Sequence, residues 1–360
     1  MTHPTPGTER SSTNTRLPAE WEPQAAVMLT WPHADTDWAE QLEIVEPLYT
    51  RLAAMIAARQ QVLIVCRDDA LRARIGACLA LAGVATNAII YGTAPSNDTW
   101  ARDHGPLTVV DTHGEARLVD FRFNGWGGKY PAELDDQITS TLHATGRFGD
   151  TGLDRSPLVL EGGALDTDGC GTLLVVRRTL IDPARNPGWR RAEIEAELRA
   201  RLGATRLLWL EQGQLSGDDT DGHIDTLARF CDTETICYVA SSDPSHPDHA
   251  ELEAMQRELQ ALRRIDGQPY RLIPLPLPRR MTDSQGNPLP ATYANFLIIN
   301  GAVLAPVYDD PADRIALERL NAAFPGREIV AIDCRPLIHQ GGSLHCITMQ
   351  LPTALTLSTV

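Results

Sequence analysis

The sequence predicts a mixed α/β fold on the strength of two observations. Segments with apolar residues at helical spacing alternate along the chain with short apolar runs that are typical of buried strands. Five of these strand candidates also adjoin a cluster of small and polar residues. The five could be degenerate copies of one strand-and-helix unit whose polar ends converge on a central site, but their identity is too low to establish a repeat.

Five segments have the residue spacing of amphipathic helices. In the first, from Asp37 to Arg59, apolar side chains recur every three or four residues and fall on one face. The third is preceded by Asn-Pro-Gly-Trp and followed by Gly203, which are helix start and stop signals. The five expected helices span residues 37–59, 69–82, 189–202, 247–264 and 310–324.

Short apolar runs between these helices are the expected strands. They are rich in Val, Ile and Leu and are bounded by Gly, Pro, Asn or Asp. A Pro- and Gly-rich stretch, residues 273–290, is expected to be one long surface loop. The expected strands span residues 25–31, 61–66, 106–110, 116–123, 172–176, 206–210, 226–230, 234–240, 296–300, 302–307, 328–333 and 346–351.

The charge of the chain limits its partners. At a formal net charge of -15, the protein should repel nucleic acid and anionic membrane surfaces. A cationic substrate is compatible with this charge, although solubility alone would also explain it. The length of 360 residues allows one large domain or two, and no low-complexity linker divides the chain.

The N-terminus and the cysteines indicate the compartment. Residues 1–16 are polar and lack the apolar run of a secretory signal, so we expect a flexible tail there. No stretch approaches the length needed to span a bilayer. Seven cysteines occur and none forms a CxxC pair, which favours free thiols in a reducing compartment. We therefore expect a cytoplasmic protein.

Cys346 is a candidate nucleophile in the segment GGSLHCITMQLP. Two glycines allow an unusual backbone path to the start of the expected strand. His345 would point to the opposite face of that strand. From this segment alone, a buried structural cysteine is the better interpretation, because free cysteines are commonly buried.

His223 and Asp225 lie in the acidic segment DDTDGHIDTLARF. Residues two apart share a face of an extended strand, so the imidazole and the carboxylate should point into the same space. The surrounding carboxylates stabilise an imidazolium. A metal site is the rival interpretation, but the segment has one histidine and the spacing of no EF-hand. A solvated acidic turn also remains open.

Two further carboxylates stand near strand ends. Asp103 follows Trp100 by three residues, and an aromatic face with a carboxylate can clamp a planar cation. Without that function the segment would be a surface turn. Glu161 ends an apolar run and precedes two glycines, which is a weak signal for function by itself.

Taken together in chain order, the motifs resemble the agmatine deiminase family, which belongs with the Porphyromonas-type peptidyl-arginine deiminases. The resemblance covers residues 18–352, and the chain departs from the usual pattern at positions such as Gln24 without losing a catalytic one. The matching segments are PAEW (18–21), TWPH (30–33), TWARDHGP (99–106), FNGWGGK (123–129), LEGG (160–163), RNPG (185–188), DDTDGHID (218–225), TYANF (292–296), FPGREIVAIDCRPLI (324–338) and GGSLHCIT (341–348).

The resemblance implies a fold and a set of roles. The fold is a five-bladed α/β propeller of the pentein type with pseudo-fivefold symmetry, formed by residues 17–360 as a single domain. Cys346 matches the nucleophile, His223 the general acid and base, and Glu161 the carboxylate that partners the histidine. Asp103 and Asp225 match the pair that grips the guanidinium nitrogens. The remaining matches line the substrate cleft: Trp100, Asp219 and Asn295.

The resemblance implies hydrolysis of agmatine to N-carbamoylputrescine and ammonia in polyamine biosynthesis, through an S-alkylamidino-cysteine intermediate. No metal or organic cofactor has a role, and the family suggests a homodimer. The acidic balance near the site favours a substrate that is cationic at both ends, although Arg122 or Lys129 could reach a carboxylate. The alternatives are deimination of peptidyl or free arginine to citrulline, amidino transfer to an amine, and non-catalytic binding of guanidines or polyamines. A papain-like protease is disfavoured because its cysteine precedes its histidine.

Overall fold

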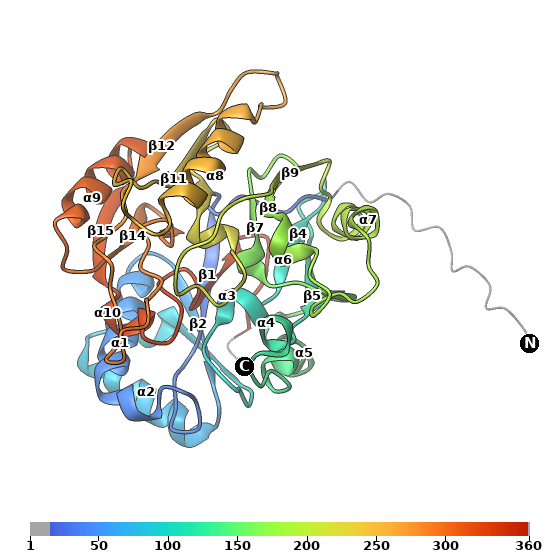
Figure 1. Ribbon diagram of the computed structural model, residues 1–360. Coiled ribbons are helices and arrows are strands. Elements are labelled where there is room, and N and C mark those ends of the chain that lie inside the picture. The colour runs from blue at the N-terminus through green and yellow to red at the C-terminus, as the bar shows by residue number, and fades with distance from the viewer. Residues whose placement is uncertain (1–14, 359–360) are drawn as a thin grey trace, which may run out of the picture.

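A computed structural model describes residues 15–358 of the chain (Figure 1). Most of the tail expected at residues 1–16 therefore lies outside the described residues. Arg16, at the end of that segment, exchanges two backbone hydrogen bonds of 2.9 Å with Val110. Within residues 15–358, no helix is both long and apolar enough to cross a membrane.

The strands of the described chain form five small sheets. One sheet has the order β16-β1-β2-β3, and the others are β4-β5-β6, β7-β8-β9, β10-β11-β12 and β13-β14-β15. The bounds are β1 Gln24–Thr30, β2 Gln61–Cys66, β3 Ile89–Thr93, β4 Leu107–Val110, β5 Ala116–Arg122, β6 Gly152–Val159, β7 Leu165–Thr167, β8 Thr172–Val176, β9 Arg206–Leu210, β10 Ala228–Phe230, β11 Thr235–Val239, β12 Arg271–Leu275, β13 Leu297–Ile299, β14 Ala302–Val307, β15 Glu328–Asp333 and β16 Thr348–Pro352.

Helices connect the strands, and the five expected ones are all present with slightly shorter bounds. The third ends at Gly203, whose φ of 66° is the left-handed conformation that glycine adopts at a helix C-terminus. The longer helices are α1 Leu42–Ala57, α2 Asp69–Leu81, α5 Ile138–Ala144, α7 Arg191–Leu202, α8 His249–Ala261 and α9 Ala312–Ala323. The single turns are α3 Ala101–His104, α4 Gly125–Gly128, α6 Arg177–Leu180 and α10 Arg335–Ile338.

Every sheet repeats one order of pairings. In each three-stranded sheet the central strand pairs antiparallel with one neighbour and parallel with the other, as β5 does with β4 and β6, and in the four-stranded sheet β1 pairs in the same way with β16 and β2. Parallel neighbours need a crossover connection, and in each sheet that connection contains a helix. The corresponding crossover helices are α1, α5, α7, α8 and α9, and α2 connects β2 to the additional parallel strand β3. The repeat that the sequence only suggested is therefore visible in the order of the elements.

Each of the twelve expected strands is present, but the sequence missed β3, β6, β7 and β12. The strand β12 corrects the expectation of one surface loop over residues 273–290, because the first three of those residues belong to it. β12 contains Pro274 and pairs only with β11, so it is an edge strand, where proline is tolerated. β6 contains Pro157 and is also an edge strand.

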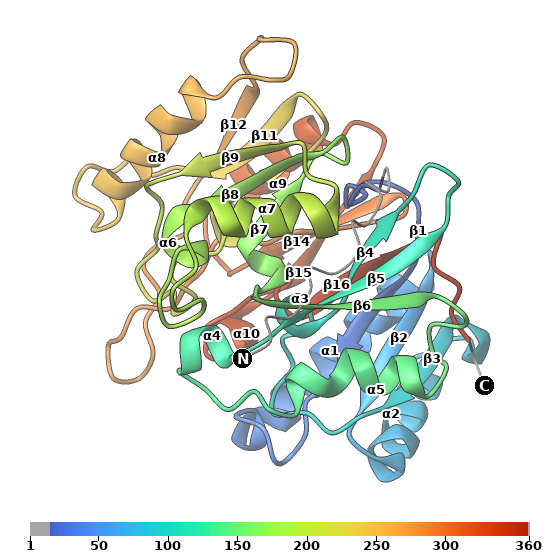
Figure 2. The same cartoon turned by 90° about the vertical axis from the view of Figure 1, so that its right-hand side faces the viewer.

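The fold brings the polar segments of the sequence to the middle of the molecule. In Figure 1 the longer helices lie around the periphery and α3 lies near the centre, and the view in Figure 2 agrees. Each polar segment directly precedes one strand of an antiparallel pair. These segments are α3 before β4, the turn Gly162–Ala164 before β7, the turn Ile224–Thr226 before β10, residues 292–296 before β13, and residues 341–347 before β16.

Candidate active site

The polar segments surround a cavity of about 220 Å³. Its lining includes the Cys346 and Asp103 side chains and a group of aromatic and acidic residues toward the surface. Three more of the candidate residues lie behind this lining, with at most 1% of each side chain exposed: His223, Glu161 and Asp225. The fold thus gathers in one place residues that are separated by up to 243 positions in the chain, from Asp103 to Cys346.

Cys346 is held by Asn295 at the edge of the cavity. The Asn295 side-chain oxygen accepts hydrogen bonds from the backbone N–H groups of His345 and Cys346, at 2.8 and 3.3 Å, and from the thiol at 3.4 Å. Because these bonds replace strand pairing, β16 begins at Thr348 and not at Cys346 as the sequence analysis expected. Burial, with the nearby charges of Asp225 and Asp103, raises the pKa of the Cys346 thiol well above its usual value.

His223 precedes a helical turn and does not lie in a strand with Asp225, which corrects the sequence expectation. The Asp218 carboxylate accepts the Gly222 N–H at 2.8 Å, and such local side-chain bonds favour turns over strands. The ring nevertheless faces the other site residues. Its Nδ1 lies 3.7 Å from Asp103 Oδ1 and its Nε2 lies 4.0 Å from Glu161 Oε2.

Asp103 is fixed by two donors. Its Oδ1 accepts the Gly163 N–H at 3.0 Å, and its Oδ2 accepts the Trp126 indole N–H at 2.9 Å. Burial raises the pKa of Asp103 to about 6, with His223 opposing the rise and Asp225 adding to it. The sequence analysis gave no role to Trp126, although it lies in the motif FNGWGGK that was noted.

Glu161 is oriented by an arginine that the sequence analysis did not single out. Arg185 Nε donates to Glu161 Oε1 at 2.8 Å, and both side chains are buried. Arg185 also bonds to Asp182, Asp221 and the Thr220 carbonyl, so its guanidinium is fully engaged. The motif RNPG was the available signal, since arginine forks are well suited to fixing carboxylates.

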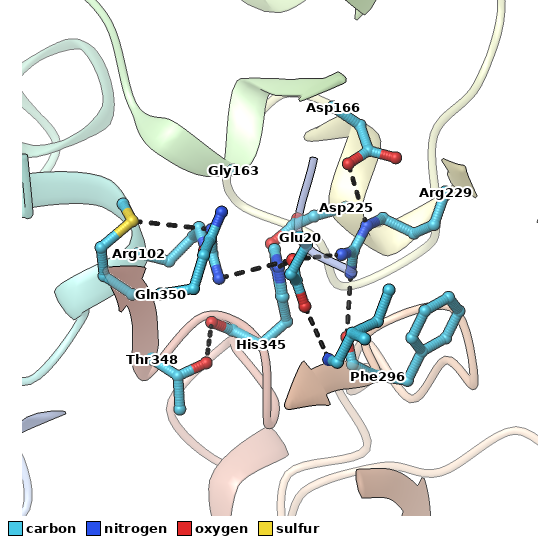
Figure 3. A network of polar contacts seen from close by, with 12 residues as sticks. Glu20, Arg102, Gly163, Asp166, Asp225, Arg229, Phe296, His345, Thr348 and Gln350 are labelled. Carbon is cyan, nitrogen blue, oxygen red and sulfur yellow. Dashed lines mark hydrogen bonds and ion pairs between the residues drawn. The ribbon is translucent and has the colours of Figure 1, made fainter. Parts of the chain in front are cut away.

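Asp225 is held by His345 and lies next to the Cys346 sulfur. Its Oδ2 accepts a hydrogen bond from His345 Nδ1 at 2.7 Å and lies 3.9 Å from Cys346 Sγ (Figure 3 shows the His345 contact). Burial acts to raise the pKa of Asp225, but the hydrogen bond and charge of His345 outweigh it, so the pKa is lowered. His345 in turn contacts Glu20, a residue that no sequence signal linked to the site.

Several buried polar atoms around the thiol have no hydrogen-bond partner among the described residues. Buried polar groups are nearly always paired, so these atoms are the ones in the site that a bound ligand could pair with. Carboxylate oxygens that surround a small space beside a thiol suit a planar cation with outward N–H groups. The unpaired atoms are Glu161 Oε2, Asp225 Oδ1, and both ring nitrogens of His223.

The mouth of the cavity is aromatic and acidic. Trp100 and Trp126 meet edge to face with ring centroids 6.4 Å apart. The Trp100 indole N–H donates to Asp98 Oδ2 at 3.0 Å, and the Tyr130 hydroxyl donates to Asp219 Oδ2 at 2.7 Å. Trp100 and Asp219, both predicted to line the cleft, therefore lie at its mouth.

The basic residues that could have received a substrate carboxylate do not line the cavity. Lys129 lies beside the mouth, where its Nζ donates to the Asp219 carbonyl at 2.5 Å and forms an ion pair with Asp221 at 2.7 Å, and Arg122 is exposed on β5. No lysine or arginine lines the cavity within the described chain. Over residues 15–358, no cluster of three or more His, Cys, Asp or Glu side chains has a geometry that could hold a metal ion.

Comparison with known proteins points to one family. Residues 16–352 match the model of the family described as Porphyromonas-type peptidyl-arginine deiminase. A Vibrio parahaemolyticus protein, provisionally named agmatine deiminase, is 34% identical over 93% of this chain and 96% of its own. The C. jejuni agmatine deiminase with substrate bound has a TM-score of 0.87 at 32% identity, covering 95% and 97% of the two chains. A Porphyromonas gingivalis crystal structure, provisionally named arginine deiminase, has a TM-score of 0.87 at 50% identity over 95% and 99%.

Proposed function

The chain belongs to the Porphyromonas-type peptidyl-arginine deiminase family, and from that membership we propose that it hydrolyses agmatine to N-carbamoylputrescine and ammonia. One observation supports this most directly. Glu161, His223 and Asp225 carry buried polar atoms without a partner among the described residues, and all three lie behind the cavity that Cys346 and Asp103 line. A guanidinium group placed there would pair with them and present its central carbon to the sulfur.

The proposal includes the architecture. The five sheets with one common order of pairings are the blades of a pseudo-fivefold α/β propeller, and residues 17–360 form a single catalytic domain. The peripheral position of the crossover helices in Figure 1 supports this arrangement. The five polar segments would then be the inner ends of the blades, which accounts for their convergence on one cavity.

Asp103 and Asp225 bind the guanidinium in this proposal. Both side chains are buried, and each is oriented by its neighbours. On binding, the guanidinium therefore replaces its hydrogen bonds to water with hydrogen bonds to carboxylates that are already in position. Two carboxylates on one cation also fix the plane of the guanidinium. The substrate carbon is thereby held near the sulfur, which converts a slow encounter into an intramolecular step.

The substrate itself activates the thiol. In the free protein the Cys346 pKa is raised by burial and by the carboxylates, which keeps the sulfur protonated. A bound cation offsets those negative charges and lowers the pKa toward ionisation. The nucleophile is therefore formed when substrate is present, and the resting thiol is protected from other electrophiles.

His223 transfers the protons. When the thiol ionises, its proton passes to His223, which becomes the imidazolium. After thiolate attack, this imidazolium protonates one terminal nitrogen of the tetrahedral adduct, and that C–N bond breaks to release ammonia. The resulting S-alkylamidino group on Cys346 is attacked by water, which His223 deprotonates. The second tetrahedral adduct expels the thiolate and leaves a ureido product. In total, agmatine dication and water give N-carbamoylputrescine monocation and ammonium.

The mouth of the cavity favours agmatine over arginine. Agmatine has an ammonium at its far end, and Asp98 and Asp219 lie among the lining residues there. Arginine or a peptide would bring a carboxylate or amide to the same place, where the lining includes His339 but no lysine or arginine of the described chain. The volume of about 220 Å³ also suits a small metabolite better than a peptide.

The test is ammonia release by purified protein from agmatine, free arginine and a peptide with a C-terminal arginine. We expect turnover of agmatine, none by Cys346→Ala, and retention by Cys66→Ala, which removes another buried thiol on β2. Preference for the peptide would contradict the assignment of agmatine as the substrate. Full turnover by Cys346→Ala would contradict the assignment of Cys346 as the nucleophile. Binding of agmatine by the wild type without ammonia release would instead indicate a non-catalytic binding protein.

A further inference from the structure

A row of buried ionic groups extends from Asp225 away from the cavity (Figure 3). His345 Nδ1 lies 2.7 Å from Asp225 Oδ2, and His345 Nε2 lies 2.8 Å from Glu20 Oε2. Glu20 and His345 are only 4% and 2% exposed. Neither residue lines the cavity, and Asp225 is the site carboxylate that the His345 ring contacts.

We propose that His345 and Glu20 are positioning residues for the proposed reaction, in which His345 donates from both ring nitrogens and fixes Asp225 with Oδ1 toward the substrate. The inference rests on the proposed function for its kinetic consequences. Its structural content, a histidine that bridges two carboxylates, is separate from the identity of the substrate.

Proton counting supports the bridge. A neutral imidazole has one N–H and one acceptor nitrogen, but both nitrogens of His345 face carboxylate oxygens at hydrogen-bond distance. The doubly protonated ring is the form that satisfies both contacts. It also places one positive charge between two buried negative ones, and buried charges are costly unless they are paired in this way.

Glu20 is itself firmly held. Arg229 Nη2 donates to its Oε2 at 2.6 Å, and the Ile298 N–H donates to its Oε1 at 2.6 Å. Burial acts to raise the pKa of Glu20, but Arg229 and His345 outweigh it and the pKa is lowered well below the usual value. Glu20 thus offers His345 a fixed, ionised acceptor, and this couples the segment before β1 to the site.

The bridge explains why two similar carboxylates in one site behave differently. Asp103 has a pKa raised to about 6, whereas the pKa of Asp225 is lowered. Asp103 receives neutral donors from Gly163 and Trp126, while Asp225 receives His345. Asp225 is therefore the carboxylate that stays ionised in the crowded site and is ready to bind a cation.

The charged and titratable groups around this pair come from several elements. On the cavity side they are Asp103, Glu161, His223 and Cys346, and on the far side they are Glu20, Arg102, Asp166 and Arg229. The far-side arginines favour an ionised Asp225 too, so removal of His345 leaves part of the effect in place.

His345→Gln tests the bridge, because glutamine can donate to one carboxylate but carries no charge. An opposite charge at contact distance shifts a carboxyl pKa by about 1 to 3 units. We expect the acidic limb of the pH profile of kcat/KM to move to higher pH by about 1 unit or more. Most of the decrease in kcat/KM should come from a higher KM. Glu20→Gln should move it in the same direction by less. A uniform loss at every pH, with the limb unmoved, would overturn the proposal and indicate a merely structural role.

Two further measurements separate this result from failure of the proposed function. His33→Gln is the matched control, since that buried ring bonds Ser96 and no site residue, and it should keep the wild-type pH profile. The nitrogen NMR signals of His345, assigned by their loss in His345→Gln, require no substrate. Two protonated ring nitrogens at pH 7 are expected, and a single protonated nitrogen would overturn the bridge. If the protein does not turn over agmatine, the pH profile is measured with free arginine or the arginyl peptide, whichever of the two is a substrate.

Discussion

At the scale of single residues, Gly163 provides the space in which the site side chains meet. A methyl group added at this residue would lie 2.6 Å from His223 Nδ1 and 2.8 Å from Asp103 Oδ1. We expect Gly163→Ala to reduce kcat by about 100-fold or more, because a displacement near 1 Å is enough to disrupt catalytic geometry. Ammonia release measures kcat, and thermal unfolding checks that the protein remains folded.

Gly76→Ala is the control for this substitution. Its added methyl group would lie 3.6 Å from the Tyr91 hydroxyl, an ordinary contact, and alanine is the better residue in the interior of α2. This variant should keep full activity with equal or higher stability. Wild-type kcat in Gly163→Ala would show that the site tolerates the methyl group and that its geometry is looser than described.

The sequence identified the residues that approach the thiol but not the residues that orient them. Cys346, His223 and Asp103 stand in motifs with recognisable neighbours. Glu20 and His345 are 325 positions apart and meet only in the fold, so no local pattern connects them. His345 was expected to point to the opposite face of a strand from Cys346, but both residues precede β16, and the His345 ring and the Cys346 sulfur both lie next to Asp225 Oδ2. The sequence also could not tell that the other ring nitrogen of His345 meets a second carboxylate, Glu20.

At the scale of elements, a buried carboxylate fixes the loop that leads to α3. Asp135, in the turn Asp135–Gln137, accepts the backbone N–H groups of Asn97 at 2.7 Å and Asp98 at 3.2 Å. Burial raises the pKa of Asp135 to about 8, against about 3.9 for an unfolded aspartate. Between these values the folded state holds a proton that the unfolded state releases, so stability falls as pH rises, by about 1.4 kcal/mol per unit.

Asp135→Asn should remove that pH dependence. Asparagine keeps an acceptor oxygen and never ionises, so the free energy of unfolding of the variant relative to wild type should rise from pH 6 to about pH 8 and then level off. Urea unfolding at several pH values measures this. Asp111→Asn is the control, because Asp111 lies in an exposed turn and the pKa of its carboxyl is lowered. This variant should leave the dependence of the free energy of unfolding on pH unchanged between about pH 6 and pH 8. A variant curve parallel to wild type would show that Asp135 is already ionised.

Elements with strong periodicity were predictable, whereas the four strands that the sequence missed, β3, β6, β7 and β12, all lie at sheet edges. The amphipathic spacing of α1 and α9 is a local property, and both helices lie where expected. β6 and β12 each have a partner on one side only, so they can contain proline and polar residues. Their pairing depends on β5 and β11, and no feature of their own sequence indicates it.

At the scale of the whole molecule, the two ends of the chain meet in one sheet. β1 pairs antiparallel with β16, with Met28 opposite Met349. The first and last strands of the described chain are therefore neighbours in one sheet. This pairing also places the Cys346 turn beside α3, where the Arg102 N–H donates to the Cys346 carbonyl at 3.1 Å. Cys346, the proposed nucleophile, is therefore positioned by the pairing of the first and last described strands, a long-range property that composition could not reveal.

The charge of the whole molecule gives the last prediction. The net charge is -15, and the cavity is lined by Asp37, Asp98 and Asp219 as well as Asp103. A dication should be attracted to this field roughly twice as strongly as a monocation, and salt screens the attraction over about 10 Å at 0.1 M. We expect kcat/KM for agmatine to fall with added NaCl more steeply than for butylguanidine, which lacks the terminal amine. Equal slopes would mean that the terminal ammonium does not feel the acidic mouth, and the preference for agmatine would then need another cause.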